Sequence, residues 1–382
     1  MKLYLDYNAG TPLAPRVLAA MSECLSGMPG NPSSTHQFGR AARARLDRAR
    51  EQVAALVGAH ASQVIFTSGG TEANNLALHA VTAGRTPGHL AVSAIEHPSV
   101  LEAARALQKS GWRLDLIEPD GNGRITVEAL RRVLKPDTRL VSVMLANNET
   151  GVIQPIAELA ACARAAGAVM HTDAVQAAGK VPVDFEATGA QLMTLSAHKL
   201  YGPKGAGALI VDKALELEPL LYGGGQERGL RAGTENIAAI VGFGVAAELA
   251  GEAREAQAVR QAELRDYLQA GLKSHAQITV FAESTQRLPN TLQFAVAGLD
   301  GETLLMQLDK AGIAVSSGSA CASGKSEPSH VLLAMGVDPE LARGAVRVSL
   351  GRETTRQDID TLLGAIAEKI EWLNKAARVA GW

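Results

Sequence analysis

The sequence predicts an α/β protein with a mostly parallel β-sheet covered by helices, followed by a smaller α+β domain. Apolar runs typical of buried strands alternate with helical segments through the first two thirds of the chain. The 382 residues suffice for two cores. A long Ala/Glu/Arg-rich helix from Ile237 to about Ser274 leads from one part to the other. We expect a large domain over 15–251 and a small domain that joins 1–14 to 252–382.

The expected elements follow from hydrophobic periodicity and from turn residues. Helices are expected at about 15–25 and 40–57, where apolar residues recur at helical spacing. Strands of the large domain are predicted at 64–67, 89–93, 139–145, 168–172, 192–195 and 207–211, most of them with a helix in between. The small domain is expected to contain strands at 292–296, 313–316 and 345–350 and helices at 301–311 and 359–377.

Composition and charge exclude several classes of protein. Hydrophobic residues make up 47% and charged residues 20%, the balance of a globular protein. A net charge of −2 gives no electrostatic reason to expect binding to nucleic acid or to a membrane surface. No apolar run approaches a membrane span or a signal peptide. The three cysteines Cys24, Cys162 and Cys321 are too widely spaced for a disulfide framework or a zinc site, so we expect a cytoplasmic protein.

Polar side chains cluster where the predicted strands end. In a parallel sheet, ligands bind outside the carboxyl ends of the strands. The residues at these ends are Gly70, Thr71, His97, Asn148, Asp173, Gln176, Ser196, His198 and Lys199. Each has an ordinary alternative, since His97 could be a satisfied histidine and Asp173 or Thr71 a helix cap. Their convergence on one edge of one sheet predicts a single binding site.

The chemistry of this set favours pyridoxal phosphate. Lys199, between a strand and a glycine-proline turn, could be a solvated lysine or an amine that attacks a carbonyl. Asp173 could pair with a protonated ring nitrogen, and the glycine turn before a helix at Thr71 could bind a phosphate. An imidazole at His97 could stack on the ring and move protons. These are the protein groups that pyridoxal phosphate needs, and no metal-ligand spacing competes with them.

Cys321 differs from the other two cysteines in its surroundings. It lies among serines and glycines, in a loop that would leave the thiol exposed and free to act as a nucleophile. Cys24 and Cys162 lie in Ala-rich helical segments, where a buried and inert thiol is expected.

Seven motifs together resemble the cysteine desulfurases of the class V aminotransferase group. The motifs are Ser-Gly-Gly-Thr-Glu-Ala-Asn-Asn (68–75), Glu-His-Pro-Ser (96–99), Asn-Asn-Glu-Thr-Gly (147–151), His-Thr-Asp-Ala-Val-Gln (171–176), Ser-Ala-His-Lys-Leu-Tyr-Gly-Pro-Lys-Gly (196–205), Arg-Ala-Gly-Thr-Glu-Asn (231–236) and Ser-Ser-Gly-Ser-Ala-Cys (316–321). The resemblance runs in order from Leu5 to Arg352.

The resemblance implies a fold-type I enzyme with pyridoxal phosphate bound covalently at Lys199. Asp173 would bind the ring nitrogen, Gln176 the phenolic oxygen, and His97 would stack on the ring as an acid–base. The remaining cofactor ligands would be Asn148, Gly70, Thr71, Ser196, His198 and, from the other subunit of a homodimer, Thr234. Arg347, aided by Asn31, would bind the substrate carboxylate.

For the reaction, the resemblance implies that Cys321 takes the sulfur of L-cysteine, leaving L-alanine. The persulfide would be passed to an acceptor, such as an iron–sulfur scaffold or a sulfur carrier, for iron–sulfur cluster assembly or tRNA thiolation. Gly10 departs from the family's usual threonine, and the chain ends soon after the last predicted helix, without the family's longer tail; the second departure leaves the acceptor open. A selenocysteine lyase, an aminotransferase or a non-catalytic sulfur carrier of the same fold remain as alternatives.

Overall fold

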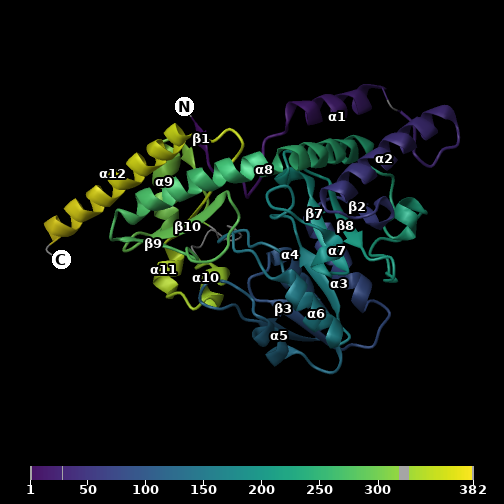
Figure 1. Cartoon of the computed structure of the whole chain (residues 1–382), viewed down its shortest axis with the longest axis horizontal. Coiled ribbons are helices and arrows are strands. Elements are labelled where there is room, and N and C mark those ends of the chain that lie inside the picture. The colour runs from purple at the N-terminus through teal and green to yellow at the C-terminus, as the bar shows by residue number, and fades with distance from the viewer. Residues whose placement is uncertain (1, 28, 318–326, 381–382) are drawn as a thin grey trace.

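The chain folds around two separate β-sheets, and one long helix extends from one sheet region to the other (Figure 1). The computed structural model describes residues 2–27, 29–317 and 327–380. The larger sheet has seven strands and the second has three, and a pair of two-residue strands lies beside the second.

The seven-stranded sheet is mostly parallel, as predicted. In spatial order its strands are β2 (Val64–Thr67), β8 (Gly207–Val211), β7 (Leu192–Ser196), β6 (Val169–Asp173), β5 (Thr138–Ser142), β3 (His89–Ser93) and β4 (Arg113–Ile117). Only β8 runs against its neighbours; the other strand pairs are parallel. Most of these strands are buried along their whole length, which explains why they read as continuous apolar runs.

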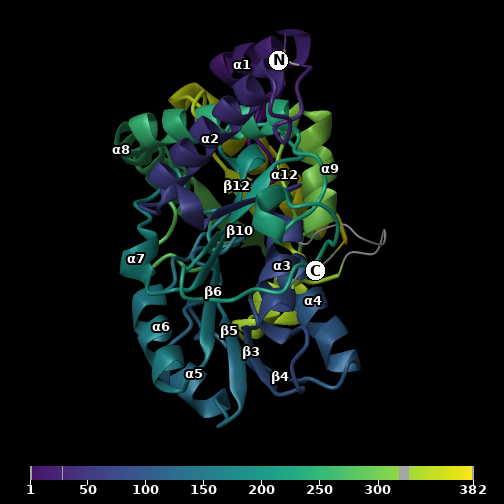
Figure 2. The same cartoon turned by 90° about the vertical axis from the view of Figure 1, so that its right-hand side faces the viewer.

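Helices cover both faces of this sheet (Figure 2). One face carries α3 (Gly70–Thr82) and α4 (Pro98–Lys109), and the other carries α5 (Val127–Val133) and α6 (Ile156–Ala165). Successive side chains of β8 point to opposite faces of the sheet, and each face has its own hydrophobic core. Leu209 belongs to the same core as Leu76 of α3, whereas Ile210 belongs to the same core as Phe243. Shorter helices are α7 (Phe185–Thr188) and the 3-10 turns η1 (Ala61–Gln63), η2 (Ala197–Lys199) and η3 (Gln226–Gly229).

The long helix α8 (Ile237–Lys273) belongs to both regions. Its first half places Phe243 in the core of the large sheet, and its second half places Leu268 in the core of the second region. Helices α1 (Pro15–Gly27) and α2 (Gln37–Leu56) pack against it. Among the described residues, no helix is both long and apolar enough to cross a membrane.

The second region joins the two ends of the chain. Its antiparallel sheet has the order β12 (Ala345–Ser349), β10 (Thr291–Val296) and β9 (Ile278–Val280). Strand β1 (Leu3–Tyr4) pairs with β11 (Ile313–Ala314), so Leu5 is buried in the same core as Phe294. The helices of this region are α9 (Gly301–Lys310), α10 (His330–Ala334), α11 (Pro339–Arg343) and α12 (Arg356–Ala380). The predicted boundaries of the two domains stay a prediction.

Candidate active site

The candidate site lies at the carboxyl-terminal edge of the seven-stranded sheet. A cavity of about 330 Å³ opens there, a size typical of small-molecule sites. The predicted residues that line it are Gly70, Thr71, His97, Asn148, Asp173, Gln176, Ser196, His198 and Lys199. The structure therefore brings together every strand-end residue that the sequence singled out.

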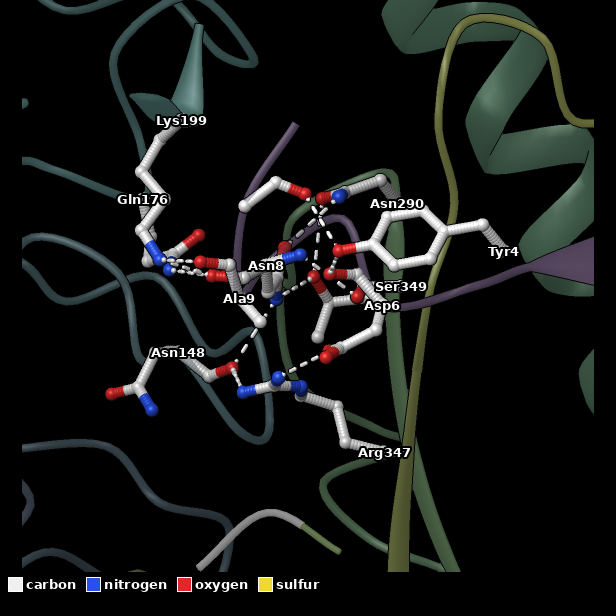
Figure 3. Close-up of polar contacts among 12 residues, drawn as sticks. Tyr4, Asp6, Asn8, Ala9, Asn148, Gln176, Lys199, Asn290, Arg347 and Ser349 are labelled. Atoms are coloured by element: carbon white, nitrogen blue, oxygen red, sulfur yellow. Dashed lines mark hydrogen bonds and ion pairs between the residues drawn. The ribbon is translucent and has the colours of Figure 1, made fainter. Parts of the chain in front are cut away.

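Lys199 projects from the turn that follows β7. Its Nζ donates hydrogen bonds to two backbone carbonyls of the N-terminal segment, that of Asn8 at 2.5 Å and that of Ala9 at 2.8 Å (Figure 3). Burial, with a contribution from the Arg347 guanidinium, lowers the pKa of Lys199 to about 8. A larger fraction of its amine is therefore neutral near physiological pH than for an ordinary lysine, which favours attack on a carbonyl.

The backbone after Lys199 is held by Tyr201, a residue to which sequence reasoning gave no role. Tyr201 has a φ of 61°, in the left-handed region that non-glycine residues rarely adopt. Its amide donates to Thr11 Oγ1 at 2.7 Å, its hydroxyl accepts from the Arg352 amide at 2.7 Å, and the Arg352 guanidinium lies 4.3 Å from its ring centre. These contacts over-determine the turn and fix the direction in which Lys199 leaves it.

Asp173 is buried at the end of β6 with both carboxylate oxygens oriented by donors. Oδ1 accepts from the Val175 amide at 2.9 Å and Oδ2 from Asn74 Nδ2 at 2.8 Å. Asn74 also donates to Ser99 Oγ at 2.8 Å, so it links α3, α4 and β6. Sequence reasoning quoted Asn74 only as part of a motif. Its position one turn after Gly70, on the helix that covers the sheet, is the signal that could have identified it.

His97 has both of the roles weighed from the sequence, since it caps α4 and lines the cavity. Its Nδ1 accepts from the Ser99 amide at 3.1 Å, which leaves Nε2 as the atom free to carry a proton. Burial lowers the pKa of His97; the nearby Asp173 carboxylate opposes this effect and Lys199 adds to it. Gln176 Nε2 donates to the Asn8 carbonyl at 3.0 Å, and its Oε1 accepts from Lys180 Nζ at 2.8 Å.

The end of the cavity beside α3 contains buried polar atoms without partners. Ser196 Oγ and His198 Nδ1 are buried and make no hydrogen bond to any residue that the structure describes. Such atoms are costly unless a ligand or water binds them. Gly70 opens α3 here, and a Cβ at this position would come within 3.2 Å of Val175 Cγ2. An amide-rich helix start with unpaired hydroxyl and imidazole groups fits the phosphate of pyridoxal phosphate.

Arg347 lies at the other end of the site, on β12. Its Nη2 donates to Asp6 Oδ1 at 2.6 Å and its Nη1 to the Asn148 carbonyl at 3.0 Å (Figure 3). Its buried Nε has no hydrogen-bond partner in the described part of the chain. It does not line the cavity itself but contacts Asn148, which does. Sequence reasoning missed Asp6 as its partner, because more than three hundred residues separate the two.

The segment that contains Cys321 starts and ends beside this site. Ser316 and Arg347 exchange two backbone hydrogen bonds of 3.2 and 2.7 Å. After the segment, Ser329 Oγ donates to the buried Glu149 carboxylate at 2.5 Å. Cys321 itself lies outside the described residues, so its predicted role is not tested here.

Asn31 and Thr234 are not among the residues that line the cavity. Asn31 Oδ1 accepts from the Ser33 amide at 2.9 Å within its own loop, and Thr234 is exposed ahead of α8. At Gly10, a Cβ would lie in ordinary contact with His198 Nδ1, at 3.6 Å. The family's usual threonine at this position would therefore not be excluded by its Cβ.

Glu96 is a further group that sequence reasoning passed over. Its side chain is fully buried and Oε1 accepts from the Met144 amide at 2.5 Å. Burial, with the Asp173 carboxylate nearby, raises the pKa of Glu96 to about 8. Among the described residues, no group of histidine, cysteine and carboxylate side chains could hold a metal ion.

The fold and the site define a pyridoxal-phosphate-dependent enzyme, and comparison with known proteins specifies its kind. The family model for class V aminotransferases matches residues 3–362, so the chain belongs to that family. A curated relative named cysteine desulfurase IscS, from Dictyoglomus turgidum, is 44% identical over 97% of this chain and 95% of its own length. A cysteine desulfurase from Gluconacetobacter diazotrophicus is 45% identical over 100% of this chain and 98% of its own length.

Solved structures agree with these relatives. A NifS-like protein superposes with a TM-score of 0.91 at 36% identity, covering 97% of this chain and 100% of its own. A NifS-like protein from Rickettsia africae gives a TM-score of 0.89 at 33% identity, with coverages of 97% and 100%. The α/β fold predicted from the sequence is confirmed.

Proposed function

We propose that this protein is a cysteine desulfurase that uses pyridoxal phosphate to remove sulfur from L-cysteine, leaving L-alanine. The observation that supports this most directly is that one cavity is lined by Lys199, by Asp173 and, beside α3, by Ser196 and His198. The Oγ of Ser196 and the Nδ1 of His198 have no hydrogen-bond partner among the described residues. The nearly full-length relatives named cysteine desulfurase supply the reaction. When bound, the cofactor acts as the electron sink of the reaction.

Lys199 binds the cofactor covalently and moves a proton at the substrate Cα. The lowered pKa suits both tasks, because attack and proton abstraction need the neutral amine. Asp173 pairs with the ring nitrogen, and Asn74 orients that carboxylate. His97 would contact the cofactor ring and exchange a proton at Nε2, and Gln176 and Asn148 would bind polar atoms of the cofactor.

Gly70, Thr71, Ser196 and His198, at the start of α3 and the end of β7, would hold the phosphate of the cofactor. The pKa of His198 is lowered to about 4, mainly by burial, with Lys199 and Lys204 contributing. In the chain without a ligand the imidazole is therefore neutral, and its N–H can donate a hydrogen bond to the phosphate. Thr234, exposed ahead of α8, reaches the phosphate of the partner subunit in a homodimer.

The substrate carboxylate binds to Arg347, with help from Asn31. The Cys321 thiolate attacks the sulfur of the bound cysteine; the carbon–sulfur bond breaks and its electron pair stays with carbon, which is then protonated to give alanine. Sulfur remains on Cys321 as a persulfide, so no external oxidant is needed. We infer transfer to an acceptor such as an iron–sulfur scaffold or a sulfur carrier, in the cytoplasm.

Replacing Cys321 by serine tests the reaction. We expect Cys321→Ser to lose cysteine-dependent alanine formation by about a thousandfold or more, since serine cannot accept sulfur. The visible absorbance of the lysine-bound cofactor should remain. Cys162→Ser, on α6, is the matched control and should keep full activity. Alanine formation at the wild-type rate by Cys321→Ser would instead indicate a lyase that needs no thiol.

A further inference from the structure

Asn8 is buried between the two sheet regions, and its side chain uses both of its polar atoms twice. Only 1% of the residue is exposed. Its Nδ2 donates to the Asn148 carbonyl at 3.2 Å and to Thr291 Oγ1 at 2.9 Å. Its Oδ1 accepts from Asn290 Nδ2 at 3.1 Å and from Lys180 Nζ at 3.3 Å. The side-chain carboxamide of Asn8 thus connects residues of the large sheet region with residues at the start of β10.

The backbone of the same residue binds the proposed catalytic lysine. The Asn8 carbonyl accepts from Lys199 Nζ and from Gln176 Nε2, and the Ala9 carbonyl accepts a second bond from Lys199 (Figure 3). The Asn8 amide N–H donates to Ser349 Oγ at 2.9 Å, on β12. The position of this short segment therefore determines where the Lys199 amine rests.

We propose that Asn8 is a positioning residue for Lys199. Its side chain anchors the segment so that the carbonyls of Asn8 and Ala9 hold the ε-amino group in one place at the cavity wall whenever that group is not bonded to the cofactor. The proposal rests on the role of Lys199 given under the proposed function. A carboxamide suits this position because it offers two donors and two acceptor lone pairs, and the chain supplies a partner for each.

The groups around the Lys199 amine determine how its pKa would change if the segment at Asn8 and Ala9 moved away. Charged or titratable groups face Lys199 from every element packed around it: Asp6, His97, Asp173, Lys180, His198 and Arg347. Burial is the largest cause of the lowered pKa of Lys199. If the segment moved away, Nζ would lose two carbonyl acceptors, which by itself lowers the pKa of Lys199. Water would replace them and relieve the burial, which is the larger cause, so the net shift of the pKa is upward.

The test measures how acetylation of Lys199 depends on pH in the full chain freed of pyridoxal phosphate. The extent of acetylation is monitored by trace labelling and mass spectrometry. For Asn8→Ala we expect the midpoint of labelling to rise by about one pH unit or more, towards that of an ordinary lysine. Gln191→Ala is the matched control. The side-chain oxygen of Gln191 accepts a hydrogen bond from the backbone N–H of Met170, at the amino-terminal edge of the sheet and away from the cavity. Its midpoint should equal that of the wild type.

A second variant keeps the test decisive if Asn8→Ala fails to fold. Thr291→Val preserves shape but removes one acceptor of the Asn8 side chain, and it should shift the midpoint in the same direction by a smaller amount. A wild-type midpoint in whichever of the two variants melts cooperatively overturns the proposal. Failure of the proposed function would look different, since the wild-type protein itself would then form no alanine from cysteine.

Discussion

The two ends of the site differ in how their polar groups are satisfied. At the phosphate end, beside α3, Ser196 Oγ and His198 Nδ1 are buried without partners among the described residues. At the substrate end, beside β12, the Arg347 guanidinium already has a carboxylate partner in Asp6 and a carbonyl partner in Asn148. The first end is prepared for a ligand that stays bound, and the second contains its own counterion.

This difference follows from the ligands that the two ends are proposed to bind. A resident cofactor can complete the hydrogen bonds of a buried hydroxyl, so the protein need not supply a partner. A substrate leaves after each turnover, and a buried arginine without a counterion would then be strongly destabilising. Asp6 therefore stabilises the substrate-free protein, whereas the phosphate-end groups stabilise only the loaded one.

The largest expected effect concerns Glu96, whose buried carboxyl accepts from the Met144 amide and lies near Asp173. Its pKa is about 8 in the folded chain and about 4.3 when unfolded, so the native state binds more protons between these values. The stability that this carboxyl contributes is complete below about pH 4 and is lost as the pH rises through 8. Relative to Glu96→Gln, the wild type should lose about 3 kcal/mol of unfolding free energy between pH 5 and pH 8.

Urea unfolding of both proteins across this pH range, without cofactor, measures the difference. The glutamine variant keeps an oxygen for the Met144 amide and cannot ionise, so it is its own control for packing. A constant difference between the two proteins would show that Glu96 does not change its charge in this range.

A smaller effect is expected from Asp6→Ala at the substrate end. The change leaves a buried guanidinium with no carboxylate, and we expect the cofactor-free chain to lose about 2 kcal/mol of stability. Asp47→Ala removes an exposed ion pair with Arg43 and should cost less than about 0.5 kcal/mol. Equal losses in the two variants, measured by denaturant unfolding, would contradict the assignment of Asp6 as a necessary counterion.

The smallest effect is expected from Ser196→Ala at the phosphate end. Because Ser196 Oγ has no partner in the part of the chain that the structure describes, the cofactor-free variant should be as stable as the wild type. Its dissociation constant for pyridoxal phosphate should rise about tenfold, the value of one hydrogen bond to a charged group. Titration of cofactor absorbance and thermal melting give the two quantities. If the cofactor-free variant were destabilised and its affinity for the cofactor unchanged, Ser196 would stabilise the fold and not the bound cofactor, contrary to the difference between the two ends.

Sequence patterns predicted the buried parts of the fold better than the edges. The strands β8 and β3, both inside the sheet, agree with the predicted ranges, since fully buried strands read as apolar runs. Strands β4 and β9 were missed. Both lie at sheet edges and are only partly buried, so polar residues interrupt the apolar pattern.

The sequence alone determined which residues of the large sheet would form the site. Asp173 and Ser196 end buried strands, His97 and Lys199 follow such strands within a few residues, and parallel strands bring their carboxyl ends to one edge. Tertiary structure alone decided the rest: that Asp6 partners Arg347 and that Asn8 holds Lys199. Those contacts depend on a two-residue strand packing beside the C-terminal sheet, a pairing too short to leave a periodic signal.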